Sequence, residues 1–177
     1  LEPSCPVLYS MRGYHYCDLL LSRDAVDEVL FRAEQSLHVV GDRKNPLSVA
    51  LDHLSIGRAH LAHLCVNDPA SSERVLRHLD VAVSGLRSAQ VQDELPRGLL
   101  ARADYYLQIG ELPLTRSNLQ EALDIATWGD MRLHEVDARL GFVRYYINVP
   151  DLAAAREELD LVSRLIIDTG YVRRQPE

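Results

Sequence analysis

Hydrophobic residues recur at helical spacing along most of the chain. The clearest stretch is 25–40, where apolar positions follow one another mostly at intervals of three and four residues: Val26, Val29, Leu30, Ala33, Leu37 and Val40. This spacing places them on one face of a helix and leaves the charged residues on the other. Gly41 follows directly, and glycine often ends helices because it adopts the left-handed conformation at little cost. The stretch is therefore predicted to be an amphipathic helix.

The same kind of spacing predicts eight helices, at 7–21, 25–40, 47–64, 73–88, 97–109, 112–127, 131–147 and 151–168. Residues that begin or end helices lie between them. Pro46 and Pro96 suit the start of a helix, and Gly110 suits the end of one. Ser71 or Ser72 is the expected cap of the fourth helix, because a serine hydroxyl accepts a hydrogen bond from an unpaired backbone N–H.

The chain also repeats itself at a spacing of 40 residues. Tyr105–Tyr106 is matched by Tyr145–Tyr146, and further matched pairs are Leu100 with Leu140, Ala101 with Gly141, Thr115 with Ala155, and Ala122 with Val162. A fixed period in this range is typical of stacked helical repeats. We therefore expect Leu79, Leu119 and Leu159 to occupy equivalent positions in successive helix pairs.

These observations predict an all-α protein with a single repeat domain over 1–177, a right-handed α–α superhelix (solenoid) of about four antiparallel helix pairs. The pairs are expected at 7–40, 47–88, 97–127 and 131–168. In such a solenoid each repeat packs only on its neighbours. Because the sequence begins with Leu1 instead of methionine, we expect it to be a piece of a longer protein.

The charge and hydropathy of the sequence narrow the range of partners that we expect. The formal net charge is −7, and the 19 basic residues are scattered and include only Lys44 as a lysine. A nucleic-acid-binding protein usually concentrates its basic residues on one face, so direct binding to nucleic acid is not expected. No apolar run approaches the roughly 18–20 residues that cross a bilayer, and we expect no membrane partner.

The three cysteines, Cys5, Cys17 and Cys65, form no Cys-x-x-Cys pair and have no metal-ligand spacing. Cys17 and Cys65 lie in apolar segments, where a free thiol behaves as a small hydrophobic group. Free cysteines are typical of reducing compartments, which predicts a cytoplasmic location.

The helix pairs resemble tetratricopeptide (TPR) repeats, in which small residues at fixed positions allow helices to approach closely. In the third pair the matching residues are Ala103, Tyr106, Gly110, Thr115, Leu119 and Ala122, and in the fourth they are Val143, Tyr146, Pro150, Ala155, Leu159 and Val162. The second pair matches with Gly57, His60, Val75, Leu79 and Ala82, given an insertion of about six residues around 65–71. The resemblance implies that Tyr106 and Tyr146 face the core. HEAT-type repeats, which share the longer period, are the structural alternative.

Residues 8–174 also resemble the C-terminal TPR arrays of bacterial STAND-type signalling NTPases. The phrases that carry this resemblance are 52–61, 95–103 and 129–135. It implies a sensor or scaffold arm of a larger signalling protein. The GxxxxGK[ST] phosphate loop required for the NTPase reaction is absent from this sequence.

In TPR arrays the first helix of each pair lines the binding groove. Carried over by position, the partner-binding residues would be Arg58, Arg97, Asp104, Gln108, Asp137, Arg144 and Asn148. An arginine offers a planar fork that suits a carboxylate. The mixed signs argue against a simple cationic clamp, and pairing of Arg97 or Arg144 with an aspartate of a neighbouring repeat is the alternative.

No catalytic residue, cofactor or metal is predicted. His53, His60 and His63 share one helix, but a zinc site needs three or four convergent ligands, so packing or hydrogen bonding is the preferred interpretation. Acidic pairs such as Glu157–Glu158 have no nucleophile beside them and are interpreted as solvated surface.

The sequence therefore predicts a noncatalytic scaffold or sensor arm that binds a protein or peptide. Two hypotheses remain beside it. One is a ligand- or peptide-sensing domain of a transcription regulator, and the other is a module that self-associates through its terminal helices.

Overall fold

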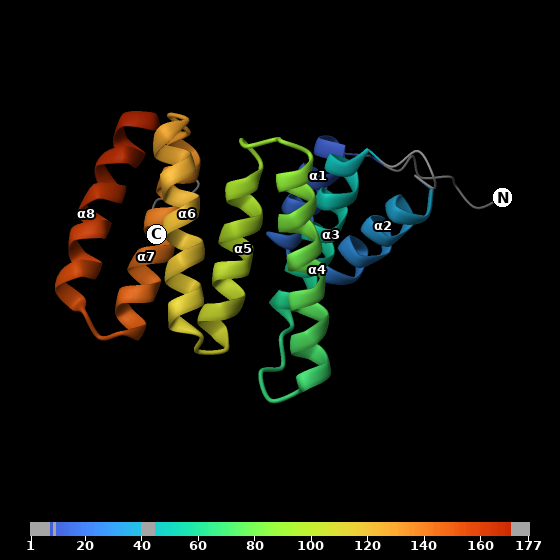
Figure 1. Cartoon of the computed structure of the whole chain (residues 1–177), viewed down its shortest axis with the longest axis horizontal. Helices are drawn as coiled ribbons and strands as arrows, with labels where there is room; N and C mark the ends of the chain where they lie inside the picture. The colour runs from blue at the N-terminus through green and yellow to red at the C-terminus, as the bar shows by residue number, and fades with distance from the viewer. Residues whose placement is uncertain (1–7, 9, 40–44, 171–177) are drawn as a thin grey trace. The chain divides into compact units, whose positions relative to one another are not determined.

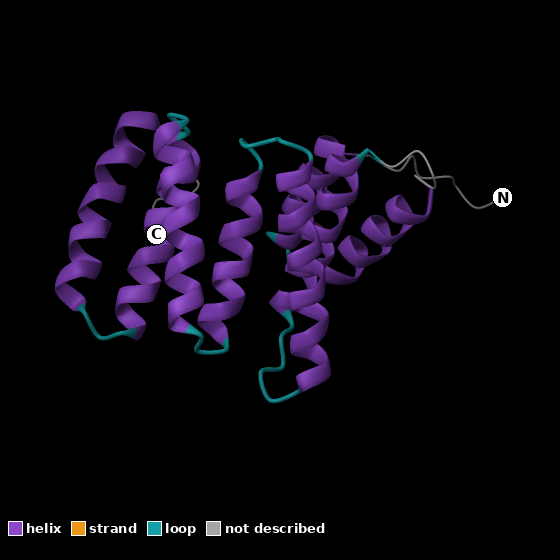
Figure 2. Ribbon diagram, viewed as in Figure 1, coloured by secondary structure: helices purple, strands orange, loops and turns teal. Residues whose placement is uncertain are grey.

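The computed structural model describes residues 8, 10–39 and 45–170, and in these ranges it contains eight α-helices and no strand (Figures 1 and 2). The all-α prediction is confirmed. Gly41 and the expected start of the first helix at residue 7 lie outside the described residues. The helices fall into two compact units, Leu1–Val91 and Gln92–Glu177. The prediction of one domain over the whole chain stays a prediction.

In the first unit, α3 lies among the other three helices. The helices are α1 (Ser10–Leu21), α2 (Val26–Val39), α3 (Pro46–Ala62) and α4 (Pro69–Ser88), and α3 contacts each of the others. Because it is enclosed on several sides, its buried residues are spread around the helix and include Leu51, Leu54, Ile56 and Ala59. The predicted pairing of α1 with α2 and of α3 with α4 is confirmed.

The start of α4 differs from the prediction. Asp68, and neither Ser71 nor Ser72, caps this helix, because its carboxylate accepts a hydrogen bond from the backbone N–H of Ala70 at 3.0 Å. Pro69 then occupies the first turn, where a missing N–H costs nothing. The hydroxyl of Ser71 accepts instead from the backbone N–H of Cys65 at 3.3 Å, which ties the preceding loop to the helix.

In the second unit, α7 has the central place. The helices are α5 (Leu95–Gln108), α6 (Leu112–Trp128), α7 (Arg132–Asn148) and α8 (Leu152–Thr169), and α7 contacts each of the others. Helices α5 and α6 pair, as do α7 and α8. A small core cluster of Ala103, Leu119 and Phe142 joins α5, α6 and α7, and Tyr145 and Tyr146 pack against it.

Two glycines allow helices to approach very closely. A Cβ atom added to Gly57 would lie 2.7 Å from Cδ2 of Leu79, and one added to Gly141 would lie 2.4 Å from Cδ2 of Leu119. The first contact joins the two helices of one pair, and the second joins the second helix of a pair to the first helix of the next. Both leucines are almost fully buried, at 0% and 1% exposure. Gly57, one of the small residues of the TPR resemblance, therefore stands where neighbouring helices are in contact, and so does Gly141, which the 40-residue period matches with Ala101.

The third leucine of the 40-residue series departs from its expected environment. Leu159 is 40% exposed, although it occupies the same repeat position as Leu79 and Leu119. The difference has a simple cause, since α7 covers Leu119 and no helix within the described residues covers the corresponding face of α8. Leu152 and Ile167 on α8 are also exposed, at 70% and 78%.

The turns of the second unit show a period of 20 residues inside the period of 40. After α5, α6 and α7, the chain closes each helix with the same hydrogen bond, which runs from a backbone N–H to the carbonyl oxygen five residues earlier. The three bonds join Glu111 to Tyr106, Met131 to Ala126, and Asp151 to Tyr146, with N···O distances of 2.8–2.9 Å. This bond satisfies a carbonyl that the helix leaves unpaired. Gly110 and Asp130 occupy the left-handed region in the first two turns, with φ of 81° and 51°.

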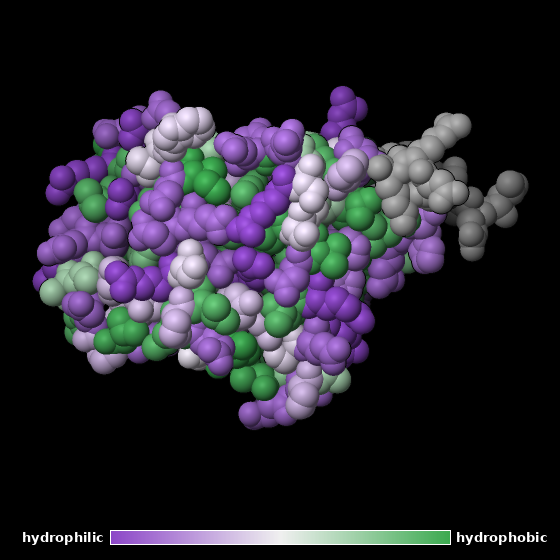
Figure 3. Space-filling view, in the orientation of Figure 1, coloured by the Kyte–Doolittle hydropathy of each residue, from purple (hydrophilic) through white to green (hydrophobic). Residues whose placement is uncertain are grey.

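The exposed face of the second unit is mixed in character. In Figure 3 its hydrophobic residues form small groups among hydrophilic ones.

None of the helices in the described ranges is long and apolar enough to cross a membrane.

Replacing Gly110 by alanine should lower the free energy of unfolding by about 1 kcal/mol, because a side chain in the left-handed conformation costs about that much. Nothing lies within 4 Å of the added Cβ, so the effect isolates backbone strain. Asp130→Gly is the matched control and should instead stabilise the protein, since it relieves the same strain one turn later. Urea denaturation followed by circular dichroism measures both. Equal stability of the two variants and the wild type would contradict the assignment of strain.

Candidate functional site

The residues predicted to bind a partner in the second unit lie along two neighbouring helices. Arg97, Asp104 and Gln108 belong to α5, and Asp137, Arg144 and Asn148 belong to α7. On each helix the three residues are spaced by seven and then four positions, which places them on one face. Because α5 contacts α7, the two sets lie on adjacent helices. We call these six residues the α5–α7 face.

The charges of the α5–α7 face are complementary at the 40-residue spacing. Arg97 is matched by Asp137, Asp104 by Arg144, and Gln108 by Asn148. Nη2 of Arg144 donates to Oδ1 of Asp104 at 2.9 Å, so this pair joins the first helices of two successive helix pairs. Pairing across repeats, the alternative weighed for Arg144, is what the structure contains. Both side chains nevertheless stay accessible, with 54% and 42% exposure.

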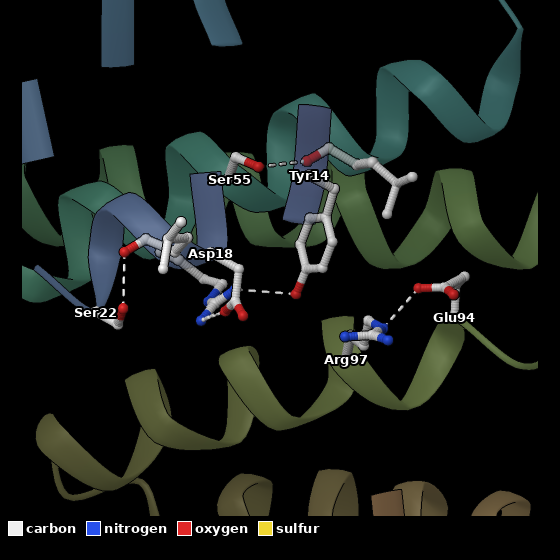
Figure 4. Close-up of polar contacts among 9 residues, drawn as sticks. Tyr14, Asp18, Ser22, Ser55, Glu94 and Arg97 are labelled. Carbon is white, nitrogen blue, oxygen red and sulfur yellow. Dashed lines mark hydrogen bonds and ion pairs between the residues drawn. The ribbon is translucent and has the colours of Figure 1, made fainter. Parts of the chain in front are cut away.

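Arg97 and Asn148 of this face are also held in place. Arg97 forms a 2.7 Å ion pair with Glu94 at the start of α5 (Figure 4). Nδ2 of Asn148 donates to the backbone oxygen of Arg144 at 2.9 Å. The face is therefore a set of preoriented donors and acceptors, and both Gln108 and Asn148 are exposed.

His134 belongs to the same region, although no sequence pattern identified it. Burial lowers the pKa of its imidazole, as does the positive charge of Arg97, while Asp137 and Asp93 act in the opposite direction. The net lowering keeps the ring neutral near pH 7, where it both donates and accepts hydrogen bonds. Its position three residues before Asp137 was the available signal.

Arg58, the predicted binding residue in the first unit, takes part in the contact between α1 and α3. Its Nη1 donates to the hydroxyl of Tyr14 at 2.9 Å and its Nη2 donates to Asp18 at 2.7 Å (Figure 4). The guanidinium also lies over the Tyr14 ring, 5.8 Å from its centroid. With 28% of its side chain exposed, Arg58 serves mainly to hold α1 on α3.

The tyrosine assignment implied by the resemblance is only partly right. Tyr105 is the buried member of its pair, at 3% exposure, and Tyr106 is partly exposed. In the next pair both Tyr145 and Tyr146 pack against the cluster around Phe142. Sequence spacing shows that adjacent residues of a helix point in different directions. Which of the two side chains is buried depends on where the neighbouring helices lie.

An open groove, which sequence reasoning missed, lies beside α6. One part has a volume of about 850 Å³ and is bordered by α6 residues together with Tyr145 of α7 and Val149, which directly follows α7. A second part of about 670 Å³ shares Asp124 and Ile125 with the first and ends near Trp128. The indole of Trp128 is 85% exposed. The available signal was that Trp128 is the single tryptophan of the sequence.

Three histidines come together in the first unit. Nδ1 of His53 lies 3.0 Å from Nδ1 of His78, and the ring of His60 lies 5.9 Å from that of His78 between centroids. His63 lies outside this group, at the end of α3. Among the described residues no three His, Cys, Asp or Glu side chains are arranged to hold a metal ion.

A buried carboxyl group also lies in the first unit. Asp52 is 6% exposed and accepts a 2.7 Å hydrogen bond from the hydroxyl of Ser36. Burial raises its pKa to about 6, and the Ser36 hydrogen bond offsets only part of that. Cys17 lies near Asp52, and burial raises the pKa of its thiol, which is inert for that reason. Cys65, expected in an apolar segment, is instead exposed.

Comparison with known proteins adds no relative: no family model, no curated protein and no solved structure matches this chain. The α5–α7 face, the α6 groove and the buried groups of the first unit are therefore interpreted from their own chemistry.

The variant Asp52→Asn should remove a pH dependence of stability. The folded-state pKa of Asp52 is raised, so its stabilising contribution is complete below pH 4 and is lost as pH rises through about 6. Relative to the wild type, the asparagine variant should gain on the order of 2 kcal/mol between pH 4 and pH 8.

Urea denaturation of both proteins at several pH values measures this gain. Asp160→Asn, at an exposed position of α8, is the control, and its stability difference from the wild type should vary much less with pH. A constant difference between Asp52→Asn and the wild type across this range would show that the carboxyl is not desolvated.

Proposed function

We propose that this chain is a noncatalytic interaction module whose α5–α7 face binds a protein or an extended peptide. The proposal includes a TPR-like superhelical arrangement of the helix pairs. It is supported by the paired helices, by glycines at the helix contacts, and above all by the accessible Asp104–Arg144 pair that joins successive repeats.

The chemistry of the face favours a partner with both donors and acceptors. The face cannot select a partner by a positively charged end or by a single carboxylate, because Asp104 and Arg144 carry opposite charges and are already in contact. The exposed amides of Gln108 and Asn148 can each donate to and accept from a peptide group. An extended peptide presents such groups along its whole length.

Preorganisation is the second argument. Side chains that are already held by hydrogen bonds lose less conformational freedom when a partner binds, which reduces the cost of association. Asn148 is bonded to Arg144, and Arg144 to Asp104. The face therefore presents a fixed pattern without a rearrangement of α5 or α7.

The proposed setting is the regulatory arm of a larger cytoplasmic signalling protein. Its support is the sequence resemblance to STAND-type arrays, and the partner would be a protein, with no direct contact to nucleic acid or membrane. Deleting residues 47–169 from the parent protein and measuring its regulation tests this setting separately from peptide binding.

Peptides selected by display on the wild-type chain provide the direct test. Replacing Gln108 or Asn148 by alanine should weaken their binding about tenfold, the equivalent of ~1.4 kcal/mol, because each amide loses its bonds to the peptide. Arg156→Ala, an exposed position on α8, is the matched control and should bind as the wild type does. Fluorescence anisotropy measures the affinities.

A charge swap separates binding from stability. The double variant Asp104→Arg, Arg144→Asp keeps an ion pair across the repeats, and a pair this exposed contributes at most about 1 kcal/mol to folding. The swap should therefore preserve stability and lose the selected peptides. Unchanged binding by the swap and by both amide variants would place the binding surface elsewhere.

Self-association is a second candidate, favoured by the exposed Leu152, Leu159 and Ile167 on α8. Light scattering over a range of protein concentrations distinguishes a dimer from a monomer. The sensing domain of a transcription regulator remains the other hypothesis drawn from sequence.

A further inference from the structure

Two histidine side chains meet between α3 and α4. Nδ1 of His53 and Nδ1 of His78 share a hydrogen bond of 3.0 Å, in which the tautomer decides the donor, and the ring centroids are 5.0 Å apart with a tilt of 36°. Both rings are half-buried. Each belongs to a regular helix, and the two helices are in direct contact, so the two nitrogens are held by a rigid support.

The separation of the two nitrogens suits a metal ion. With metal–nitrogen bonds of about 2.0–2.1 Å, donors 3.0 Å apart subtend an angle of about 94° at the metal. This angle matches adjacent positions of a square-planar or octahedral ion, the geometries that Cu²⁺ and Ni²⁺ adopt with imidazole ligands. A tetrahedral Zn²⁺ site would require the nitrogens to be about 3.3 Å apart.

We propose that His53 and His78 form a two-histidine binding site for a divalent transition-metal ion of the Ni²⁺ or Cu²⁺ type, with water in the remaining positions. No third His, Cys, Asp or Glu side chain is arranged with them to hold a metal ion among the described residues, so the site is open. The His60 ring borders it at 5.9 Å from His78.

The rings lie in partly buried and positively charged surroundings. Burial, together with the neighbouring His53, His60 and Arg77, lowers the pKa of His78 to about 4. Burial together with Arg74 and Arg77 also lowers the pKa of His60, whereas Glu34 of α2 raises it.

The same surroundings limit the affinity. Arg74 and Arg77 place positive charge on α4 near the rings, and Glu34 supplies the only opposing charge named above. Two neutral ligands with water completing the shell make a weaker site than a three- or four-ligand cage. The site should therefore take a metal with high affinity for imidazole and leave Mg²⁺ unbound.

Calorimetric titration of tag-free protein with NiCl₂ at pH 7.5 tests the proposal. The background is Cys65→Ser, because the exposed thiol of Cys65 is itself a metal ligand. One equivalent of Ni²⁺ should bind, and MgCl₂ should give no binding heat. His53→Asn and His78→Asn should each weaken Ni²⁺ binding about tenfold or more.

The matched control is His63→Asn. It removes an exposed histidine at the C-terminal end of α3 and should leave the affinity for Ni²⁺ unchanged. Circular dichroism checks the fold of each variant, and His53→Gln and His78→Gln replace any variant that loses helicity. The Cu²⁺-loaded protein should show paramagnetic resonance coupling to two nitrogens, and to one in either histidine variant. Absence of binding, or equal affinity of the His53 and His78 variants and the wild type, overturns the proposal.

Discussion

The close approach of a leucine to a glycine on a neighbouring helix sets the helix spacing in both units. Leu79 lies against Gly57, and Leu119 lies against Gly141, at distances that leave no room for a Cβ atom. Interiors packed this densely transmit any change in side-chain volume to the helices around them. The two leucines occupy the same repeat position, yet one contacts the partner helix of its own pair and the other contacts the following pair. A single residue position thus serves both kinds of contact in the stack.

Ion pairs between first helices follow the same spacing. Asp18 pairs with Arg58 in the first unit and Asp104 pairs with Arg144 in the second, each across 40 residues. The exposed Asp104–Arg144 pair contributes little to stability, and the less exposed Asp18–Arg58 pair holds α1 on α3. The two ion pairs fix which residues lie side by side on the first helices of successive pairs. In the first unit the arginine is also bonded to Tyr14, and in the second it stays open to a partner. The same repeat position is therefore structural in one unit and available for recognition in the other.

A second polar position connects the proposed metal site to the repeat. Allowing for the insertion in the second pair, His53 and His78 occupy the positions of Arg139 and Glu158, which pair at 3.0 Å between α7 and α8. Polar side chains meet at this place in both helix pairs, and their chemistry differs. Because the helices supply only the geometry, one scaffold position can hold an ion pair in one repeat and two imidazoles in another.

The sequence by itself determined the helices, most of their ends and the period of the repeat. These features depend on the spacing of apolar residues and on the conformational preferences of residues such as Gly110, which act over a few neighbours. The cap of α4 was misassigned because Asp68 and two serines compete locally for the same role. The α5–α7 face could be placed on one side of its helices, since that also follows from spacing alone.

The tertiary structure alone decided which polar groups meet and which apolar groups are covered. The bonds of Arg58 to Tyr14 and Asp18, the raised pKa of Asp52 and the contact of His53 with His78 all join residues distant in sequence or depend on burial by other helices. Leu159 illustrates the limit most clearly. Its repeat position predicted a buried leucine, and its exposure depends on whether another helix lies over α8, which no local pattern in the chain encodes.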